Sequence, residues 1–152
     1  MTKRRVMTAL AAAAIAWALP AGAYLSPESI VTSKDGSSLY VAEVAAGQVV
    51  EVTTNRMAVA RVRKVAGSPH GLALSADGTR LAVAAGGADG VVVIIDTKTF
   101  REVSRIKAGH TPTAPVFSPD GASLYVCNRF DNDVSVLDTA SRKQLARIPV
   151  VR

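Results

Sequence analysis

Short runs of apolar residues, separated by turn-forming residues, follow one another along the chain after residue 24. Val134 and Val136 flank Ser135, and this alternation of apolar and polar positions is typical of a strand with one buried face. Residues 91–95 (Val-Val-Val-Ile-Ile) form a continuous apolar run, which suits a strand covered on both faces. No segment after residue 24 has helical periodicity. The pattern therefore predicts an all-β protein.

Turn-forming residues recur along this pattern with one period. Asp35-Gly36, Asp77-Gly78 and Asp120-Gly121 lie 42 and 43 residues apart, each between two apolar runs. Asp bonds to the nearby backbone and Gly adopts positive φ, so each pair predicts a hairpin. Two further markers keep the period, namely Pro27, Pro69 and Pro112, and then Thr53-Thr54, Asp96-Thr97 and Asp138-Thr139. A period of about 40 to 50 residues is the length of a β-propeller blade.

The period divides the chain into three repeats, which span residues 25–67, 68–109 and 110–152. Each repeat contains four strand-like runs. In the third repeat these runs are approximately residues 114–118, 123–127, 133–138 and 144–149. Four antiparallel strands that need a neighbour to cover their faces describe a propeller blade. We therefore predict a β-propeller with about three four-stranded antiparallel blades. Because closed propellers have about four to eight blades, the ring is incomplete.

The third repeat carries the fullest version of the motif. It contains Ser-Pro-Asp-Gly at residues 118–121, Leu-Tyr-Val at 124–126, Asn128, and Val-Ser-Val-Leu-Asp-Thr at 134–139. Together with the Pro near its first strand, this motif resembles the YVTN family of bacterial β-propeller repeats. The resemblance covers residues 25–152 and implies a ring of about seven blades, roughly 300 residues at this repeat length.

The other two repeats depart from the motif. The second has Ala84-Ala85 where the Asn region falls, and the first has Lys34 before its turn and Thr53 in place of the second Asp. The resemblance is specific for the fold and not for the function, since such propellers have many roles.

The first 23 residues predict a signal peptide. Lys3, Arg4 and Arg5 precede an apolar run at residues 6–19, and Ala-Gly-Ala at 21–23 is a small-residue cleavage site. The apolar run is shorter than the roughly 20 residues of a membrane span, so an N-terminal anchor helix is the less favoured alternative. We expect export to the periplasm or the cell exterior, with no membrane span after cleavage.

The chain has a net charge of +6, from 18 basic and 12 acidic residues. Removal of the predicted leader leaves 15 basic residues and a net charge of +3. Many of the basic residues lie in the last strand of each repeat or in the turn just before it: Arg61, Arg63, Lys64, Arg101, Arg105, Lys107, Arg142, Lys143 and Arg147. We expect these side chains to form solvated outer edges that resist edge-to-edge pairing. An anionic surface partner stays an alternative, whereas export and an aromatic content of 5% disfavour nucleic acid.

The single cysteine excludes an internal disulfide and any Cys-x-x-Cys metal or haem site. We expect Cys127 to be a small buried apolar residue, the alternative being an intermolecular bond or a reactive thiol. The glycine-rich residues 86–90 lack the Lys-Ser/Thr of a phosphate loop, and the Asp-Gly turns carry too few carboxylates for calcium. We therefore expect no cofactor, no metal and no catalytic constellation.

Strand order places the candidate ligand-binding residues at one end of the blades. In an up-and-down blade, the loop that enters the first strand and the loop between the second and third strands lie at the same end. The candidates at that end are His70, His110, Asn128, Arg129, Phe130 and Asp131. Loops carry much of the binding function of proteins, and His also serves as an acid or base. The alternative for each is an ordinary turn residue.

Length implies that apolar blade faces are exposed. The 129 residues after residue 23 suffice for three blades, so both outermost blades present an open face. We favour a chain that is the first part of a longer protein, since the sequence at residues 148–152 stops at the end of a fourth strand, with no capping sequence. The alternatives are two chains that form a six-bladed ring, and a short open segment. We expect the chain alone to be poorly soluble or to self-associate.

These features favour an exported, non-catalytic scaffold that binds a protein, a cell-surface polymer or a small molecule. One alternative is the propeller part of a periplasmic redox system, associated with a cytochrome c or a quinone-linked dehydrogenase, as relatives of this repeat type imply. Another is a truncated fragment without independent function. Whether the protein is an enzyme is left open, with the non-enzyme interpretation favoured.

Overall fold

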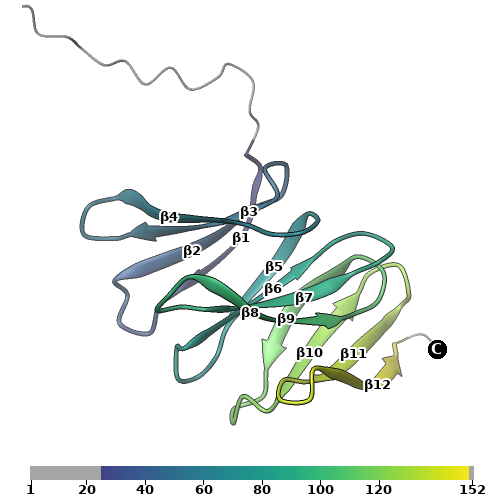
Figure 1. The fold of residues 1–152 in the computed structure, drawn as a ribbon. Coiled ribbons are helices and arrows are strands. Elements are labelled where there is room, and N and C mark those ends of the chain that lie inside the picture. The colour runs from purple at the N-terminus through teal and green to yellow at the C-terminus, as the bar shows by residue number, and fades with distance from the viewer. Residues whose placement is uncertain (1–24, 151–152) are drawn as a thin grey trace, which may run out of the picture.

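The structure is a computed structural model that describes residues 25–150, and the predicted signal peptide lies outside these residues. The described chain forms twelve strands in three four-stranded antiparallel sheets and no helix. The sheets stand side by side as three blades (Figure 1). The predicted all-β fold and incomplete propeller are therefore confirmed.

Blade 1 is the sheet of the first four strands. Its strands are β1 (Pro27–Thr32), β2 (Ser38–Glu43), β3 (Gln48–Thr53) and β4 (Ala58–Lys64). They pair in chain order, so blade 1 is a simple up-and-down meander. A register shift between Glu51 and Val52 bends the outer strand β4.

Blades 2 and 3 repeat this order. The strands of blade 2 are β5 (Pro69–Leu74), β6 (Arg80–Ala85), β7 (Val91–Asp96) and β8 (Arg101–Lys107). Those of blade 3 are β9 (Pro112–Phe117), β10 (Ser123–Asn128), β11 (Asp133–Asp138) and β12 (Lys143–Pro149). Strand β5 contacts both β1 and β9, so the first strands lie innermost where the blades meet.

Blade 2 is covered on both faces. The face toward blade 1 buries Leu81, Val83 and Ile95 beside Tyr40 and Phe100, whose rings stack with centroids 6.3 Å apart. The other face packs against blade 3, and the buried residues there are Ala82, Ala84, Val92, Ile94, Ile106, Ala108, Leu124, Val126 and Leu137. The continuous apolar run of β7 is thus explained by its position between two neighbours.

The Asp-Gly turns join the first and second strand of each blade, as predicted. In blade 2, Ser75 Oγ donates to Asp77 Oδ1 at 2.6 Å and the Thr79 amide donates to the same oxygen at 3.0 Å. Gly78 has φ 76°, a conformation that a side chain disfavours. Hydrogen bonds from Ser75 and Thr79 lower the pKa of Asp77 to about 2, so the carboxylate that shapes the turn stays ionised at neutral pH.

An arginine crosses each junction between blades. Arg61 of β4 pairs with buried Glu51, donates to the Thr97 carbonyl at 2.8 Å, and lies 4.8 Å from the ring centroid of Phe100. Arg61 therefore does more than line a solvated edge: the outer strand passes close enough to blade 2 for its guanidinium to bond the backbone there.

Cys127 does not match the expectation of a buried residue. Its side chain is exposed in the described chain. It lies on the face of blade 3 that no other blade covers, whereas Ala84, at the same place in blade 2, is 0% exposed. The side chain at this strand position is buried in blades 1 and 2, where a following blade covers the face, as for Ala42 and Ala84.

Candidate functional site

Two loops meet at one end of the junction between blades 2 and 3. The first, residues 108–111, enters β9, and the second, residues 129–132, connects β10 to β11. The Arg129 amide donates to the Thr111 carbonyl at 3.2 Å, and the Phe130 amide to the His110 carbonyl at 3.5 Å. The backbone thus brings together His110 and the polar loop that the sequence singled out.

The buried side chain of Asn128 fixes these two loops through hydrogen bonds. Its side chain is 1% exposed and accepts from the Gly109 amide at 2.9 Å. Its Nδ2 donates to Asp133 Oδ1 at 2.6 Å and to Ser135 Oγ at 2.7 Å. Because the amide group is fully engaged inside the protein, Asn128 shapes the loop and presents little to a ligand.

Asp131 fixes the upper part of the loop. Its Oδ2 accepts from the His110 amide at 2.8 Å and pairs with Arg147 of β12. Arg147 Nε also lies 2.7 Å from Asp133 Oδ2. The His110 amide hydrogen bond, together with Arg147 and against the effect of desolvation, holds the pKa of Asp131 below its ordinary value.

Phe130 projects from this fixed loop. Its side chain is among the most exposed apolar groups of the described residues, at 61%. The His110 ring meets it edge-on with centroids 4.9 Å apart, and the Arg129 guanidinium lies 5.5 Å from its centroid. We call His110, Arg129, Phe130, Asp131 and Arg147 the Phe130 cluster. It offers an aromatic face, a cation and a carboxylate within one rigid loop pair.

His70 takes a different position from the other candidates. It lies on the inner strand β5, where its Nδ1 is 3.2 Å from Glu28 Oε1 of β1. The two residues occupy the same position in successive blades, directly after Pro69 and Pro27. Its side chain is 21% exposed. His70 and Glu28 therefore form a pair of their own on the inner strands of blades 1 and 2.

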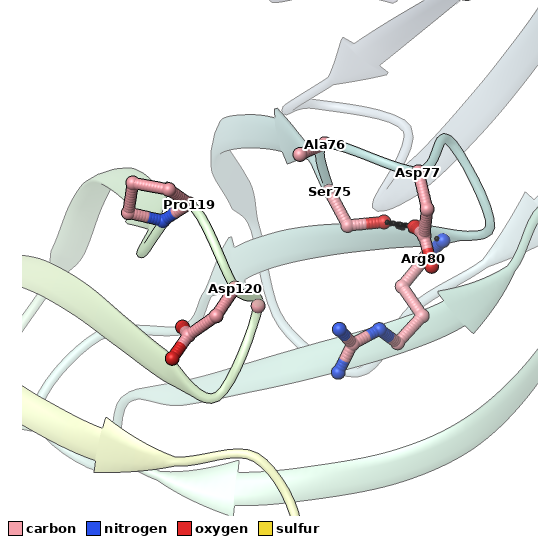
Figure 2. A pocket seen from close by; sticks show the side chains of 7 residues that line it. Ser75, Ala76, Asp77, Arg80, Pro119 and Asp120 are labelled. Carbon is pink, nitrogen blue, oxygen red and sulfur yellow. Dashed lines mark hydrogen bonds between the residues drawn. The ribbon is translucent and has the colours of Figure 1, made fainter.

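A pocket that the sequence did not predict lies at the opposite end, between the Asp-Gly turns of blades 2 and 3. Its volume is about 300 Å³, and Figure 2 shows Arg80 lying between the two turns that line it. Arg80 donates to Thr139 Oγ1 at 3.2 Å and lies 5.3 Å from the ring centroid of Phe117. The aspartates, Asp77 and Asp120, bond within their own turns. The polar groups of this pocket thus make hydrogen bonds that shape the two turns and join blade 2 to blade 3.

Only one sequence signal marks that pocket. Arg80 stands where the other blades have Ser38 and Ser123. A long, positively charged side chain at a position that holds serine in the other two blades breaks the repeat. This break is the sequence feature that indicates a special contact at the junction of blades 2 and 3.

Among residues 25–150, no group of three or more His, Cys, Asp or Glu side chains is placed to hold a metal ion. The same residues include no helix long and apolar enough to cross a membrane.

A family profile described as "Lactonase, 7-bladed beta-propeller" matches residues 25–151. The chain belongs to this seven-bladed lactonase family. The match covers most of the sequence and agrees with the three blades of the structure. No curated protein sequence matches the chain significantly.

Solved structures of other propellers resemble this family member. The hydrazine synthase of Kuenenia stuttgartiensis matches with a TM-score of 0.75 and 28% identity, over 82% of this chain and 36% of that one. The WD40 repeats of RRP9 match with a TM-score of 0.73 and 16% identity, over 82% and 39%. U3-55K matches with a TM-score of 0.72 and 17% identity, over 82% and 39%. Because their identities are 16% and 17%, the similarities to RRP9 and U3-55K show only that the fold is shared.

The chain therefore spans little more than a third of the length of these propellers.

Proposed function

We propose that this chain is part of an exported β-propeller that binds a ligand at the Phe130 cluster. The observation that carries the proposal is an exposed phenylalanine held between His110 and Arg129 on a loop whose backbone is fixed by buried hydrogen bonds. Ordering a side chain or loop on binding costs free energy, so a site that is already ordered binds more tightly. An apolar surface bordered by a few fixed polar groups is typical of ligand sites.

The ligand classes that suit this site are a cell-surface polymer, a protein segment and a small molecule. An aromatic ring beside a guanidinium and a carboxylate can stack on the apolar face of a sugar or side chain and bond its polar groups. The leader-like residues 1–23 support export, which would place the propeller in the periplasm or outside the cell, next to such polymers.

The test is a titration of the isotope-labelled chain with soluble cell-wall oligosaccharides, followed through amide NMR signals. We expect the signals of the loops at residues 108–111 and 129–132 to shift, and Phe130→Ala to abolish the shifts. Val103→Ala removes a different exposed apolar side chain, from β8, and should leave them unchanged. Shifts that persist in Phe130→Ala would place the binding site elsewhere.

A second candidate is hydrolysis of a lactone, the activity that the family description names. The pair His70–Glu28 favours it, because a carboxylate on Nδ1 orients an imidazole as a general base. With the Nδ1 proton donated to Glu28, His70 Nε2 can take a proton from water. The hydroxide then adds to the lactone carbonyl, and the bond from the carbonyl carbon to the ring oxygen breaks. The ring oxygen takes the proton back from His70 Nε2, which gives the open hydroxy acid and restores the neutral imidazole.

Acid release measured by titration at constant pH tests this candidate. If the pair acts as a base, the chain opens a simple lactone and His70→Gln removes the activity, whereas Phe130→Ala retains it. No lactone opening above the rate of buffer would reject hydrolysis by this chain.

A redox association is the third candidate, and the similarity to hydrazine synthase supports it. The sequence has one cysteine and no Cys-x-x-Cys-His, so in this role a covalently attached c-type haem would belong to another polypeptide or segment. Copurification of a haem protein with the chain would favour this role over ligand binding alone.

We also propose that the repeats are of the YVTN type. Support comes from the third repeat, where Asn128 of the motif bonds the Gly109 amide of the preceding blade. The same motif position holds Ala85 in blade 2 and Glu43 in blade 1.

A further inference from the structure

The carboxylate oxygens beside Phe130 are almost all occupied. Asp133 Oδ1 accepts from Asn128 Nδ2 at 2.6 Å, and Asp133 Oδ2 lies 2.7 Å from Arg147 Nε. Asp131 Oδ2 accepts from the His110 amide at 2.8 Å and pairs with Arg147 as well. Of the four oxygens of these two carboxylates, only Asp131 Oδ1 has no hydrogen bond within residues 25–150. Few acceptors are therefore left for a ligand.

The donors of the cluster are in the opposite state. The Arg129 side chain is exposed and lies against the Phe130 ring, and its guanidinium makes no hydrogen bond or ion pair with the residues that the structure describes. His110 Nδ1 lies 3.1 Å from Thr111 Oγ1, which leaves Nε2 without a partner in the same part of the chain. A guanidinium has five N–H donors and no acceptor. The cluster therefore suits a ligand that is rich in acceptors.

The charges of the cluster leave room for an anion. The carboxylates of Asp131 and Asp133 are matched by the guanidinium groups of Arg129 and Arg147. Hydrogen bonds to Asp133 and Asp131 raise the pKa of Arg147, so that this guanidinium is committed to the two carboxylates. Asp89, on the adjoining loop at residues 86–90, is exposed. The unpaired charge that lies against the Phe130 ring is the positive charge of Arg129.

The exposure of Phe130 does not depend on where the chain ends. The backbone hydrogen bonds of the three equivalent loops place Ala45 of blade 1 and Gly87 of blade 2 at the same position. Both of these blades are followed by another blade, and yet both residues are exposed. A Cβ on Gly87 would meet nothing within 4 Å. A side chain at this position therefore points into solvent even where the next blade is in place.

Of the three blades, blade 3 alone has a cation and a ring at these positions. Arg129 stands where the other blades have Val44 and Gly86, and Phe130 stands where they have Ala45 and Gly87. The loops of blades 1 and 2 make the equivalent backbone bonds without such side chains. The blade fold thus does not require the pair, which favours a role in binding.

We propose that the Phe130 cluster binds a ring that carries a carboxylate, in the form of a uronic acid residue of an acidic polysaccharide. Phe130 stacks on the apolar face of the sugar, and Arg129 holds the carboxylate through two parallel N–H bonds. Because small-molecule sites are concave and bury most of their ligand, a projecting ring that is 61% exposed suits a polymer that continues past it. This inference rests on the proposed function of the cluster and names its class of ligand.

A matched pair of ligands tests the inference. Oligogalacturonic acid and its full methyl ester have the same sugar rings, but only the acid is charged. In amide NMR titrations of the isotope-labelled chain, we expect both to shift the signals of residues 108–111 and 129–132. The acid should bind about fivefold more tightly, as the gain from one exposed charge pair. Added salt should reduce this preference.

Substitutions of Arg129 assign the preference to one side chain. Arg129→Gln should bind the acid and the ester equally, since Phe130 remains while the charge is lost. Arg129→Lys keeps the charge but not the planar fork, so it should recover only part of the preference. Arg101→Gln is the matched control, because it removes an exposed arginine from the start of β8, at the opposite end of the blades, and should keep the full preference. Unchanged amide signals outside the loops verify that each variant is folded.

The outcomes separate this inference from the proposed function. Equal affinity of the wild-type chain for the acid and the ester would overturn the inference and leave ligand binding at the cluster intact. No shift with the acid would overturn it too, whereas the proposed function fails only if the cell-wall oligosaccharides also leave the loops unshifted. Benzoate tests a second source of a ring carboxylate. Binding of benzoate as tight as that of the oligomer would overturn the assignment to a polysaccharide.

Discussion

Asn128 is the residue on which the loop pair of the Phe130 cluster depends. Its side-chain amide, which is 1% exposed, accepts from the Gly109 amide and donates to Asp133 and Ser135. Asn128→Ala leaves these partners unsatisfied, so we expect a loss of unfolding free energy of about 1–3 kcal/mol. Chemical denaturation measures it.

The control for that experiment is Asn55→Ala, in the exposed turn between β3 and β4. A change no larger than that of the control would mean that Asn128 does not hold the loop. In that case the fixed geometry of Phe130 would need another cause.

Asp77 links stability to pH. Its pKa is about 2 in the folded chain against an ordinary value of 3.8, because hydrogen bonds from Ser75 and Thr79 favour the ionised form. A lowered pKa in the folded state contributes stability that is present above the ordinary pKa and is lost as the pH falls toward 2. We expect Asp77→Asn to lose less thermal stability than the wild type as the pH falls through this range.

Thermal unfolding at a series of pH values checks this expectation. Asp89→Asn, in an exposed loop, should follow the wild-type profile. Parallel profiles for Asp77→Asn and the wild type would contradict the role of this carboxylate.

Sequence reasoning at the residue scale identified the loop but not what each member does. It placed His110 and residues 128–131 at one end, since strand order alone decides which loops are neighbours. It could not separate buried Asn128 from exposed Phe130, because burial depends on how the preceding blade packs against the loop. His70 pairs with Glu28 for a similar reason: the repeat sets them at one position, and the packing of blades brings them together.

At the scale of elements, the loop between β6 and β7 fits closely against the start of β9. A Cβ on Gly90 would overlap the Gly109 carbonyl and the ring of Pro112, whereas a Cβ on Gly87 meets nothing within 4 Å. We therefore expect Gly90→Ala to lower stability by about 1–3 kcal/mol through overpacking against backbone. Gly87→Ala should stay within about 0.5 kcal/mol of the wild type.

Paired denaturation curves for the two variants test this. Equal stability would indicate that blades 2 and 3 are spaced more loosely than the structure has them. The pair isolates the junction, because both variants add the same methyl group to the same loop.

The elements themselves follow well from the sequence. The run predicted at residues 133–138 is β11 in the structure, and the other predicted runs of the third repeat differ from β9, β10 and β12 by one or two residues at an end. Apolar alternation and Asp-Gly turns act locally, so one sequence suffices to locate them. The contact of Arg61 with blade 2 was missed, since it depends on the bend of β4 and the distance between blades.

At the scale of the whole molecule, the three blades form an arc in which only blade 2 has two neighbours (Figure 1). The hydrophobic stabilisation of a repeat protein comes largely from the interfaces between neighbouring repeats. Blade 2 shares in both interfaces, and blades 1 and 3 in one each. Opening of an end blade therefore costs less free energy than opening of blade 2.

Native-state amide hydrogen exchange measures this order directly, because exchange of a hydrogen-bonded amide reports the free energy of the opening that exposes it. We predict the slowest exchange in β6 and β7, with faster exchange in the equivalent strands β2 and β3 of blade 1 and β10 and β11 of blade 3. Equal protection in all three blades, or the fastest exchange in β6 and β7, would contradict the account of blades that depend on their neighbours.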